Sequence, residues 1–225
     1  MASTAAVVRA RLWDGPTRIV HWSLVILIVL AWWSAENDKM DWHRWSGYGV
    51  LGLIAFRLIW GFAGSGSARF ASFVRGPAAT LAYARTLPSR AHADTPGHNP
   101  LGAWSVVAII AAVAAQVVTG LFAVDVDGIE SGPLSDRVSF DTGRLLAKWH
   151  HWSFWVLEAL VVVHIAAIAF YLTYKRSNLI GPMVTGRRDF AADPGLKFAP
   201  LWRAVLVAAV AAALTGWVMK GLRLH

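Results

Sequence analysis

Cysteine is absent from the 225 residues of this chain. Its absence excludes disulfides, iron–sulfur clusters held by cysteine, and a haem attached through a C-x-x-C-H motif. Charged residues are also scarce, at 15% of the chain, whereas a soluble domain usually has about 25%. Hydrophobic residues make up 56%, and the mean hydropathy is +0.49. These proportions indicate a membrane protein.

Five apolar segments are long enough, or nearly so, to cross a bilayer. We expect transmembrane helices at about residues 19–33, 41–61, 101–124, 143–174 and 201–219. The first helix can begin near Pro16, because Asp14-Gly15-Pro16-Thr17 is typical of a helix start. A signal peptide is the alternative for this segment, but the segment contains His21 and several tryptophans, and no clear cleavage site follows it.

The segments predict an all-α membrane protein, a four-helix transmembrane bundle with a fifth, C-terminal transmembrane helix. We assign residues 11–176 to the four-helix domain and residues 177–225 to a cytoplasmic loop and the fifth helix. Residues 78–86 have the composition of an amphipathic helix at the membrane surface. Most of the 13 tryptophans lie near the expected helix ends, as an interfacial belt requires.

Positive charge is unevenly distributed among the connections. The amino terminus and the loops at 64–100 and 175–197 are rich in Lys and Arg, whereas the other two inter-helix loops are short of them or rich in acids. Basic segments stay cytoplasmic, so we expect a cytoplasmic amino terminus. The net charge of +8 is then explained by the orientation of the chain in the membrane rather than by nucleic-acid binding. A fifth span would leave the carboxyl terminus outside, although Lys220 and Arg223 argue against this.

Two histidines share one face of the fourth expected helix. His150 and His164 are 14 residues apart, which is about 40° short of four full rotations and about 21 Å along the axis. Histidines inside a membrane helix are costly unless they ligate something, pair, or line a polar cavity. His151 is the alternative to His150 as the ligand on this helix, but it lies about 140° away from the face of His164. We therefore prefer His150.

The topology, which rests on charge alone, sorts four histidines into two pairs at equal depth. His21 is level with His164, and His43 is level with His150. Zinc normally takes four ligands, and no Asp, Glu or Cys joins either pair. A haem needs only two axial ligands between apolar walls. We therefore expect two b haems about 20 Å apart, whose metal ligands are His21 with His164 and His43 with His150. Taken singly, each histidine could instead form a hydrogen bond between helices.

Two further residues are candidates for cofactor binding. Gly47 is one of several small residues that let a flat ligand or another helix approach closely. Arg57 lies 14 residues beyond His43 and shares its face. Arg57 either extends to the membrane interface or, as we favour, pairs with a haem propionate. Glu158 serves in a proton relay or an inter-helix hydrogen bond, and the sequence does not choose between them.

The remaining histidines have a different expected environment. We expect His151 to face the interface or a propionate. His92, His98 and His225 lie in loops or the tail and are expected to be solvated, with His98-Asn99 capping the third helix.

Several short stretches, which together cover most of residues 11–188, carry a family resemblance. They are Trp13-Asp14, Arg18-Ile19-Val20-His21-Trp22, His43 with Gly47-Tyr48, Arg57-Leu58-Ile59-Trp60-Gly61, His98-Asn99-Pro100-Leu101-Gly102, Thr119-Gly120-Leu121, His150 with His164, and Met183-Val184-Thr185-Gly186-Arg187. In combination they resemble the bacterial cytochrome b561 family, which includes the b-type cytochrome subunits of nickel–iron hydrogenases and formate dehydrogenases. The resemblance implies a four-helix core in the bacterial inner membrane, with two b haems on the matching histidines. The fifth apolar segment departs from the hydrogenase subunits and puts a hydrogenase partner in doubt.

Several functions stay open on this evidence. Iron with two axial histidines is closed to dioxygen and suited to one-electron transfer. We therefore expect a respiratory-chain carrier between quinone and an external redox partner such as a c-type cytochrome, which the acidic loop at 125–141 could dock. The resemblance also permits a superoxide:quinone oxidoreductase, which needs a cationic external funnel, or an anchor subunit of a larger dehydrogenase or hydrogenase complex. A non-redox scaffold or transporter predicts a colourless protein. We expect no nucleic-acid partner, and the sequence is compatible with an oligomer.

Overall fold

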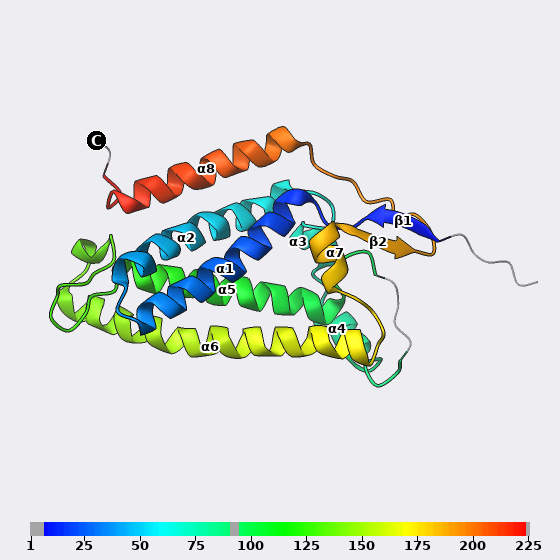
Figure 1. Ribbon diagram of the computed structural model, residues 1–225, viewed down its shortest axis with the longest axis horizontal. Helices are drawn as coiled ribbons and strands as arrows, with labels where there is room; N and C mark the ends of the chain where they lie inside the picture. The colour runs from blue at the N-terminus through cyan, green and yellow to red at the C-terminus, as the bar shows by residue number, and fades with distance from the viewer. Residues whose placement is uncertain (1–6, 91–94, 224–225) are drawn as a thin grey trace, which may run out of the picture.

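The computed structural model describes residues 7–90 and 95–223 of the chain. In chain order the elements are β1 (Val8–Arg11), α1 (Gly15–Glu36), α2 (Met40–Ala63), α3 (Phe70–Phe73), α4 (Pro77–Ala84), α5 (Pro100–Phe122), the 3₁₀ turn η1 (Ser135–Arg137), α6 (Phe140–Thr173), α7 (Ile180–Thr185), β2 (Arg187–Phe190) and α8 (Leu201–Met219). Helices α1, α2, α5, α6 and α8 are each long and apolar enough to cross a membrane (Figure 1). The chain is therefore a mostly helical membrane protein, as the sequence predicts.

Side-chain caps fix where three of the long helices begin. The Asp14 carboxylate accepts a hydrogen bond from the Thr17 backbone N–H at 2.7 Å, so α1 begins next to Pro16 as expected. The Asn99 side chain accepts from the Gly102 N–H at 2.8 Å and caps α5. Ser139 does the same for α6, which begins at Phe140, three residues before the expected start at residue 143.

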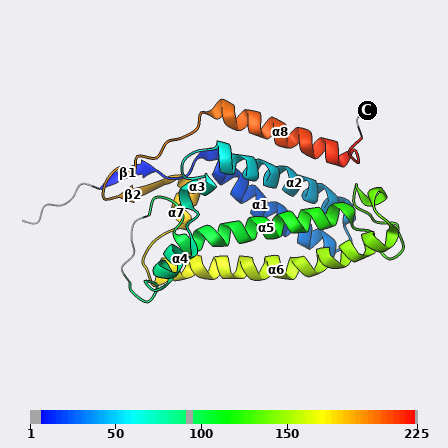
Figure 2. The same ribbon diagram turned by 180° about the vertical axis from the view of Figure 1, so that it is seen from behind.

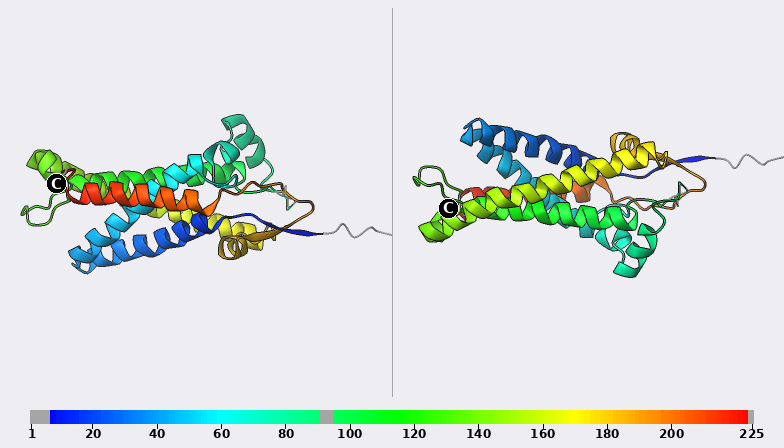
Figure 3. Two further views of the ribbon diagram at one scale, coloured as in Figure 1. Left: turned by 90° about the horizontal axis from the view of Figure 1, so that it is seen from above. Right: turned by 90° about the horizontal axis from the view of Figure 1, so that it is seen from below.

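The long helices are arranged as two antiparallel hairpins with α8 against one of them. Helix α1 packs along α2, α5 packs along α6, and α8 packs along the outer side of α2 (Figures 1 and 3). One core cluster joins α1, α2 and α8 around Trp60, which is 1% exposed. A second joins α2, α5 and α6 around Ile54, Val113 and Leu157. These clusters hold the two hairpins together.

A two-stranded antiparallel sheet joins the amino-terminal segment to the connection after α7. Val8 lies opposite Phe190, and Arg11 lies opposite Arg187. Gly186, with a φ of 80°, turns the chain out of α7. Its carbonyl accepts hydrogen bonds from the backbone N–H groups of Leu12 at 2.8 Å and Trp13 at 3.2 Å. No sequence pattern predicts this sheet. The division of the chain at residue 176 stays a prediction.

The two ends of the bundle differ in charge. We call the end that carries the sheet, α3, α4 and α7 the basic end, and the end that carries residues 37–39 and 123–139 the far end (Figures 1 and 2). Described cations near the basic end are Arg9, Arg11, Arg18, Arg57, Arg69, Arg75, Arg85, Arg90, Lys175, Arg176, Arg187, Arg188, Lys197 and Arg203; described acids there are Asp14, Asp189 and Asp193. At the far end, acids and cations are close to balanced. Only the basic end therefore carries a strong excess of one sign.

Helix α8 runs the length of the bundle and ends at the far end (Figure 1). There the Arg137 side chain donates a hydrogen bond to the Gly221 carbonyl at 2.6 Å. Arg223 forms an ion pair with Asp136 at 3.0 Å. The carboxyl-terminal cations that argued against a complete fifth crossing are thus accommodated beside the acidic far-end loop.

Candidate functional site

His43 of α2 and His150 of α6 face each other near the far end. Their ring centroids are 5.9 Å apart, and the ring planes are nearly perpendicular at 86°. A metal–imidazole bond is about 2 Å long, and the ring centre lies roughly another 1 Å beyond the nitrogen. Two imidazoles on opposite sides of one metal ion therefore have centroids about 6 Å apart. The observed spacing matches this arrangement.

Backbone carbonyls orient both rings of this pair. The Nδ1 of His43 lies 2.9 Å from the carbonyl oxygen of Ala31, and the Nδ1 of His150 lies 2.8 Å from that of Gln116. A carbonyl can only accept, so each Nδ1 is the donor and each Nε2 carries the lone pair; that of His150 accepts a hydrogen bond from the Gln116 side-chain amide. Such hydrogen bonds fix the tautomer and the orientation of metal-ligating histidines. Both imidazoles are therefore in the form that binds a metal.

The neighbours of His150 on α5 leave room for its ring and bond to it. The Gln116 side-chain nitrogen lies 3.2 Å from the Nε2 of His150, and the Thr119 hydroxyl lies 3.3 Å from its Nδ1. A β-carbon added to Gly120 would lie only 2.8 Å from the Cε1 of His150. The ring can occupy this position only because residue 120 has no side chain. The sequence analysis gave none of these three residues a role, although Thr119-Gly120-Leu121 was one of the stretches that carried the resemblance.

His21 of α1 and His164 of α6 lie near the basic end. They are close enough to interact electrostatically. The ring of His21 makes an edge contact with Trp22 at a centroid distance of 4.9 Å. Its Nδ1 is buried and has no hydrogen-bond partner among the described residues. This pair therefore differs from the far-end pair, in which both Nδ1 atoms donate to backbone carbonyls.

The helices that carry the paired histidines pack less closely against one another than the helices within each hairpin do. Close backbone packing joins α1 to α2 and α5 to α6, whereas α6 has no comparable interface with α1 or α2 along their described lengths. The histidine pairs link α6 to these two helices. A β-carbon added to Gly47, one turn beyond His43, would meet no atom within 4 Å. Gly47 therefore leaves the surface of α2 open one turn from His43, as the approach of a flat ligand requires.

The ligand set also favours a macrocycle over a bare ion. Among residues 7–90 and 95–223, no group of three or more His, Cys, Asp or Glu side chains could hold a metal ion. Two imidazoles leave a metal ion short of protein ligands. A b-type haem supplies the remaining four nitrogens from its own ring and needs only the two axial positions from the protein.

Arg57 of α2 is buried near the basic end without an acidic partner of its own. Its side chain is 7% exposed, its guanidinium lies 4.8 Å above the ring of Phe70, and its Nη1 has no hydrogen-bond partner among the described residues. The nearest acid is Asp14, whose carboxylate accepts from the Thr17 N–H and from the indole N–H of Trp60 at 3.0 Å. A buried unpaired cation is costly, so Arg57 has the character of an anion-binding residue.

The remaining histidines and Glu158 lie elsewhere. His98 is not solvated, contrary to the sequence analysis, because its ring packs between Trp13 at 4.8 Å and Phe73 at 4.7 Å. His151 is exposed on α6 and makes an edge contact with Trp155. Glu158 is also exposed on α6. His92 and His225 lie outside the described residues.

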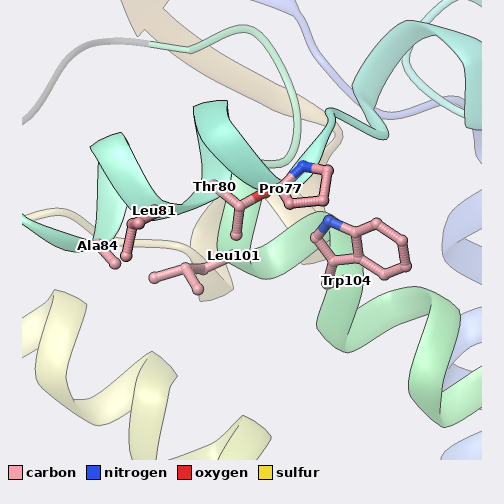
Figure 4. A pocket seen from close by; sticks show the side chains of 6 residues that line it. All are labelled: Pro77, Thr80, Leu81, Ala84, Leu101 and Trp104. Carbon is pink, nitrogen blue, oxygen red and sulfur yellow. The ribbon is translucent and has the colours of Figure 1, made fainter.

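An open apolar groove lies between α4 and the start of α5, with a volume of about 400 Å³ (Figure 4). Its lining residues are Pro77, Thr80, Leu81, Ala84, Leu101 and Trp104. The indole N–H of Trp104 already donates to the Arg75 carbonyl at 3.1 Å. The groove therefore offers little polar chemistry to orient a ligand and is suited to a lipid chain.

Comparison with known proteins identifies relatives of the chain. The family model described as prokaryotic cytochrome b561 matches residues 12–186. A protein of Bradyrhizobium diazoefficiens described as "Probable Ni/Fe-hydrogenase B-type cytochrome subunit" is 24% identical over 215 residues, covering 79% of this chain and 85% of the relative. No solved structure matches the chain. The matched region contains the four paired histidines and ends before α8.

Proposed function

The chain belongs to the prokaryotic cytochrome b561 family, and from that premise we propose that it carries electrons across the membrane through two haems. As a membrane b-type cytochrome it functions in electron transfer. We place its electron exchange between a membrane quinone and an extracytoplasmic redox protein such as a c-type cytochrome. The observation that carries the proposal is the spacing of 5.9 Å between the rings of His43 and His150.

In this proposal each haem has two protein ligands. His43 and His150 bind one iron through Nε2, with their Nδ1 atoms held by the carbonyls of Ala31 and Gln116. His21 and His164 bind the other. A haem held by two histidines would supply one-electron transfer.

Three further residues would give the haem room and a charge partner. Gly47 gives the ring access to α2, and Gly120 gives the His150 ring its place. Arg57 pairs with a propionate of the haem bound by His21 and His164. An anionic propionate supplies the negative charge that this buried guanidinium lacks.

We propose that the basic end faces the cytoplasm of a bacterium. The excess of Lys and Arg at that end supports this, since cations near transmembrane helices stay inside. The amino terminus is then cytoplasmic, and the far end, with the carboxyl-terminal end of α8, faces outward. Acidic residues of the 125–141 segment give a basic redox protein a surface to dock on.

Stopped-flow spectroscopy on the purified protein in liposomes tests this function. We expect an added quinol to reduce the haem, and an oxidised c-type cytochrome on the far side to reoxidise it. Because exposed charges control such encounters, the reoxidation rate should fall as ionic strength rises. Haem that neither quinol nor the c-type cytochrome can reduce or oxidise would contradict the proposal.

A second function is favoured by the relative from Bradyrhizobium diazoefficiens, whose description is a hydrogenase cytochrome subunit. The chain would then anchor a larger dehydrogenase or hydrogenase complex and accept its electrons. Purification from native membranes in mild detergent separates the two, because an anchor subunit retains its enzyme in a fixed ratio. Superoxide oxidation has less support, since cations do not exceed acids among the described far-end residues.

A further inference from the structure

Buried polar atoms without partners are concentrated at the basic end. Among the described residues, seven buried side-chain nitrogen or oxygen atoms have no hydrogen-bond partner, and six of these belong to the basic end. They are Thr17 Oγ1, Arg18 Nε, His21 Nδ1, Arg57 Nη1, Ser67 Oγ and His98 Nδ1. Buried polar groups in folded proteins almost always have partners. Of the six, those of His21, Arg57 and His98 belong to residues close enough to interact electrostatically. A ligand between these three residues would supply the missing partners.

The chemistry of the cluster defines the kind of ligand. Guanidinium groups can only donate, and hydroxyl and imidazole groups can donate. The one nearby acid, Asp14, already accepts from Thr17 and Trp60. Beside the Arg57 guanidinium these groups offer donors and a positive charge, and Asp14 is already engaged. A negatively charged ligand rich in acceptors complements them, and a carboxylate has both properties.

His98 is built into this cluster by aromatic packing. Trp13 and Phe73 hold its ring from two sides, with centroids at 4.8 and 4.7 Å. Burial, together with the nearby charge of Arg57, lowers the pKa of His98 to about 3. The ring is therefore neutral at physiological pH. It can donate an N–H bond beside the Arg57 guanidinium without adding a second buried charge.

We propose that His98 and Arg57 together bind a carboxylate through buried nitrogen atoms that have no partner among the described residues. The inference rests on the proposed function in one respect, because it assigns the carboxylate to the haem held by His21 and His164. His98 thereby joins the haem-binding residues, although it lies in the loop before α5 rather than in a transmembrane helix. A free carboxylate is the other source of this chemistry.

Haem with esterified carboxylates tests the assignment directly. The experiment uses the full chain with His43→Ala, which vacates the far-end site, and measures binding of haem and of haem dimethyl ester by absorbance titration. We expect the ester to bind about 10- to 100-fold more weakly, the range typical of lost hydrogen bonds to a charged group. Adding His98→Phe keeps a ring between Trp13 and Phe73. This change should reduce the ratio of haem affinity to ester affinity.

Matched variants control for general damage to the fold. Arg57→Gln should also reduce the ratio of haem to ester affinity, whereas Arg57→Lys should restore part of it. Arg85→Gln removes a basic-end cation from outside the cluster, so it should leave the ratio unchanged. Octanoate, added as the free carboxylate probe, should not quench tryptophan fluorescence at concentrations that leave haem binding intact.

The possible outcomes separate this inference from the proposed function. If haem and its ester bind equally well, the carboxylate assignment is wrong while two-histidine haem binding stands. Octanoate binding that Arg57→Gln abolishes, together with equal affinities for haem and ester, would move the site to a free carboxylate and overturn the haem assignment. If neither haem nor ester binds, the proposed function fails and this assignment fails with it.

Discussion

Replacing Gly120 with alanine should remove the far-end haem while leaving the protein folded. The added β-carbon would lie 2.8 Å from the Cε1 and 3.0 Å from the Nδ1 of His150, and ordinary contact begins at 3.4 Å. The ring must therefore retreat by about 0.6 Å (3.4 minus 2.8) from its present position. Metal–ligand distances tolerate only about 0.2 Å, so His150 can no longer bind the iron in this geometry.

The expected effect on stability is smaller than the effect on haem binding. Alanine in place of glycine favours a helix by about 1 kcal/mol, whereas overpacking costs about 1–3 kcal/mol. The net loss is about 0–2 kcal/mol, which a membrane bundle of this size should tolerate. A ring displaced from its site also weakens its bond of 2.8 Å to the Gln116 carbonyl.

Pyridine haemochrome analysis with a protein assay measures this effect as haem per chain. We expect a fall from two to one in Gly120→Ala and the loss of one component from the redox titration. Gly216→Ala is the matched control, because Gly216 lies in α8 and a β-carbon there meets nothing within 4 Å. If Gly120→Ala retains both haems with an unchanged spectrum, the placement of His150 is wrong.

Two further predictions concern the basic end. The pKa of His98 is about 3 when folded and 6.5 when unfolded, so only the unfolded chain gains this proton as pH falls from 6.5. Between pH 6.5 and about 3, the free energy of unfolding of the haem-free protein should thus fall by up to about 1.4 kcal/mol per pH unit. His98→Gln should lack this contribution, which thermal unfolding at a series of pH values measures. Trp60→Phe removes the hydrogen bond of 3.0 Å to Asp14. It should lower stability by about 1–3 kcal/mol, and an unchanged melting temperature would contradict the buried position of that carboxylate.

The main architecture could be predicted because it follows from local patterns. Apolar runs of sufficient length marked the five long helices, and Asp14 and Asn99 marked two of their starts. The 14-residue spacing of His150 and His164 set the two levels on α6. Positive charge in alternate loops predicts which end of each helix faces the cytoplasm. Each of these signals lies within a short stretch of sequence.

Other features depend on contacts between distant parts of the chain. The strands around Arg11 and Arg187 are four residues long and charged, so neither has the pattern of a strand by itself. His98 is partly buried because Trp13 and Phe73 come to it from other segments. Gly120 matters only because α6 brings His150 against it. Sequence patterns on one segment do not contain this information.

The direction of α8 shows the same limit. Lys220 and Arg223 favoured the cytoplasmic side by the charge rule, yet Arg223 pairs with Asp136 in the far-end loop. Asp136 lies 87 residues earlier in the chain, so the local charge pattern around Arg223 does not reveal this pairing.

The central claim is that four histidines hold two haems in two pairs. A reduced-minus-oxidised visible spectrum, combined with the haem-to-protein ratio, tests it most directly. We predict two low-spin b haems per chain, one haem after substitution of any one of His21, His43, His150 and His164, and two after His151→Ala. A colourless protein, or a full haem complement after loss of any paired histidine, would contradict the account.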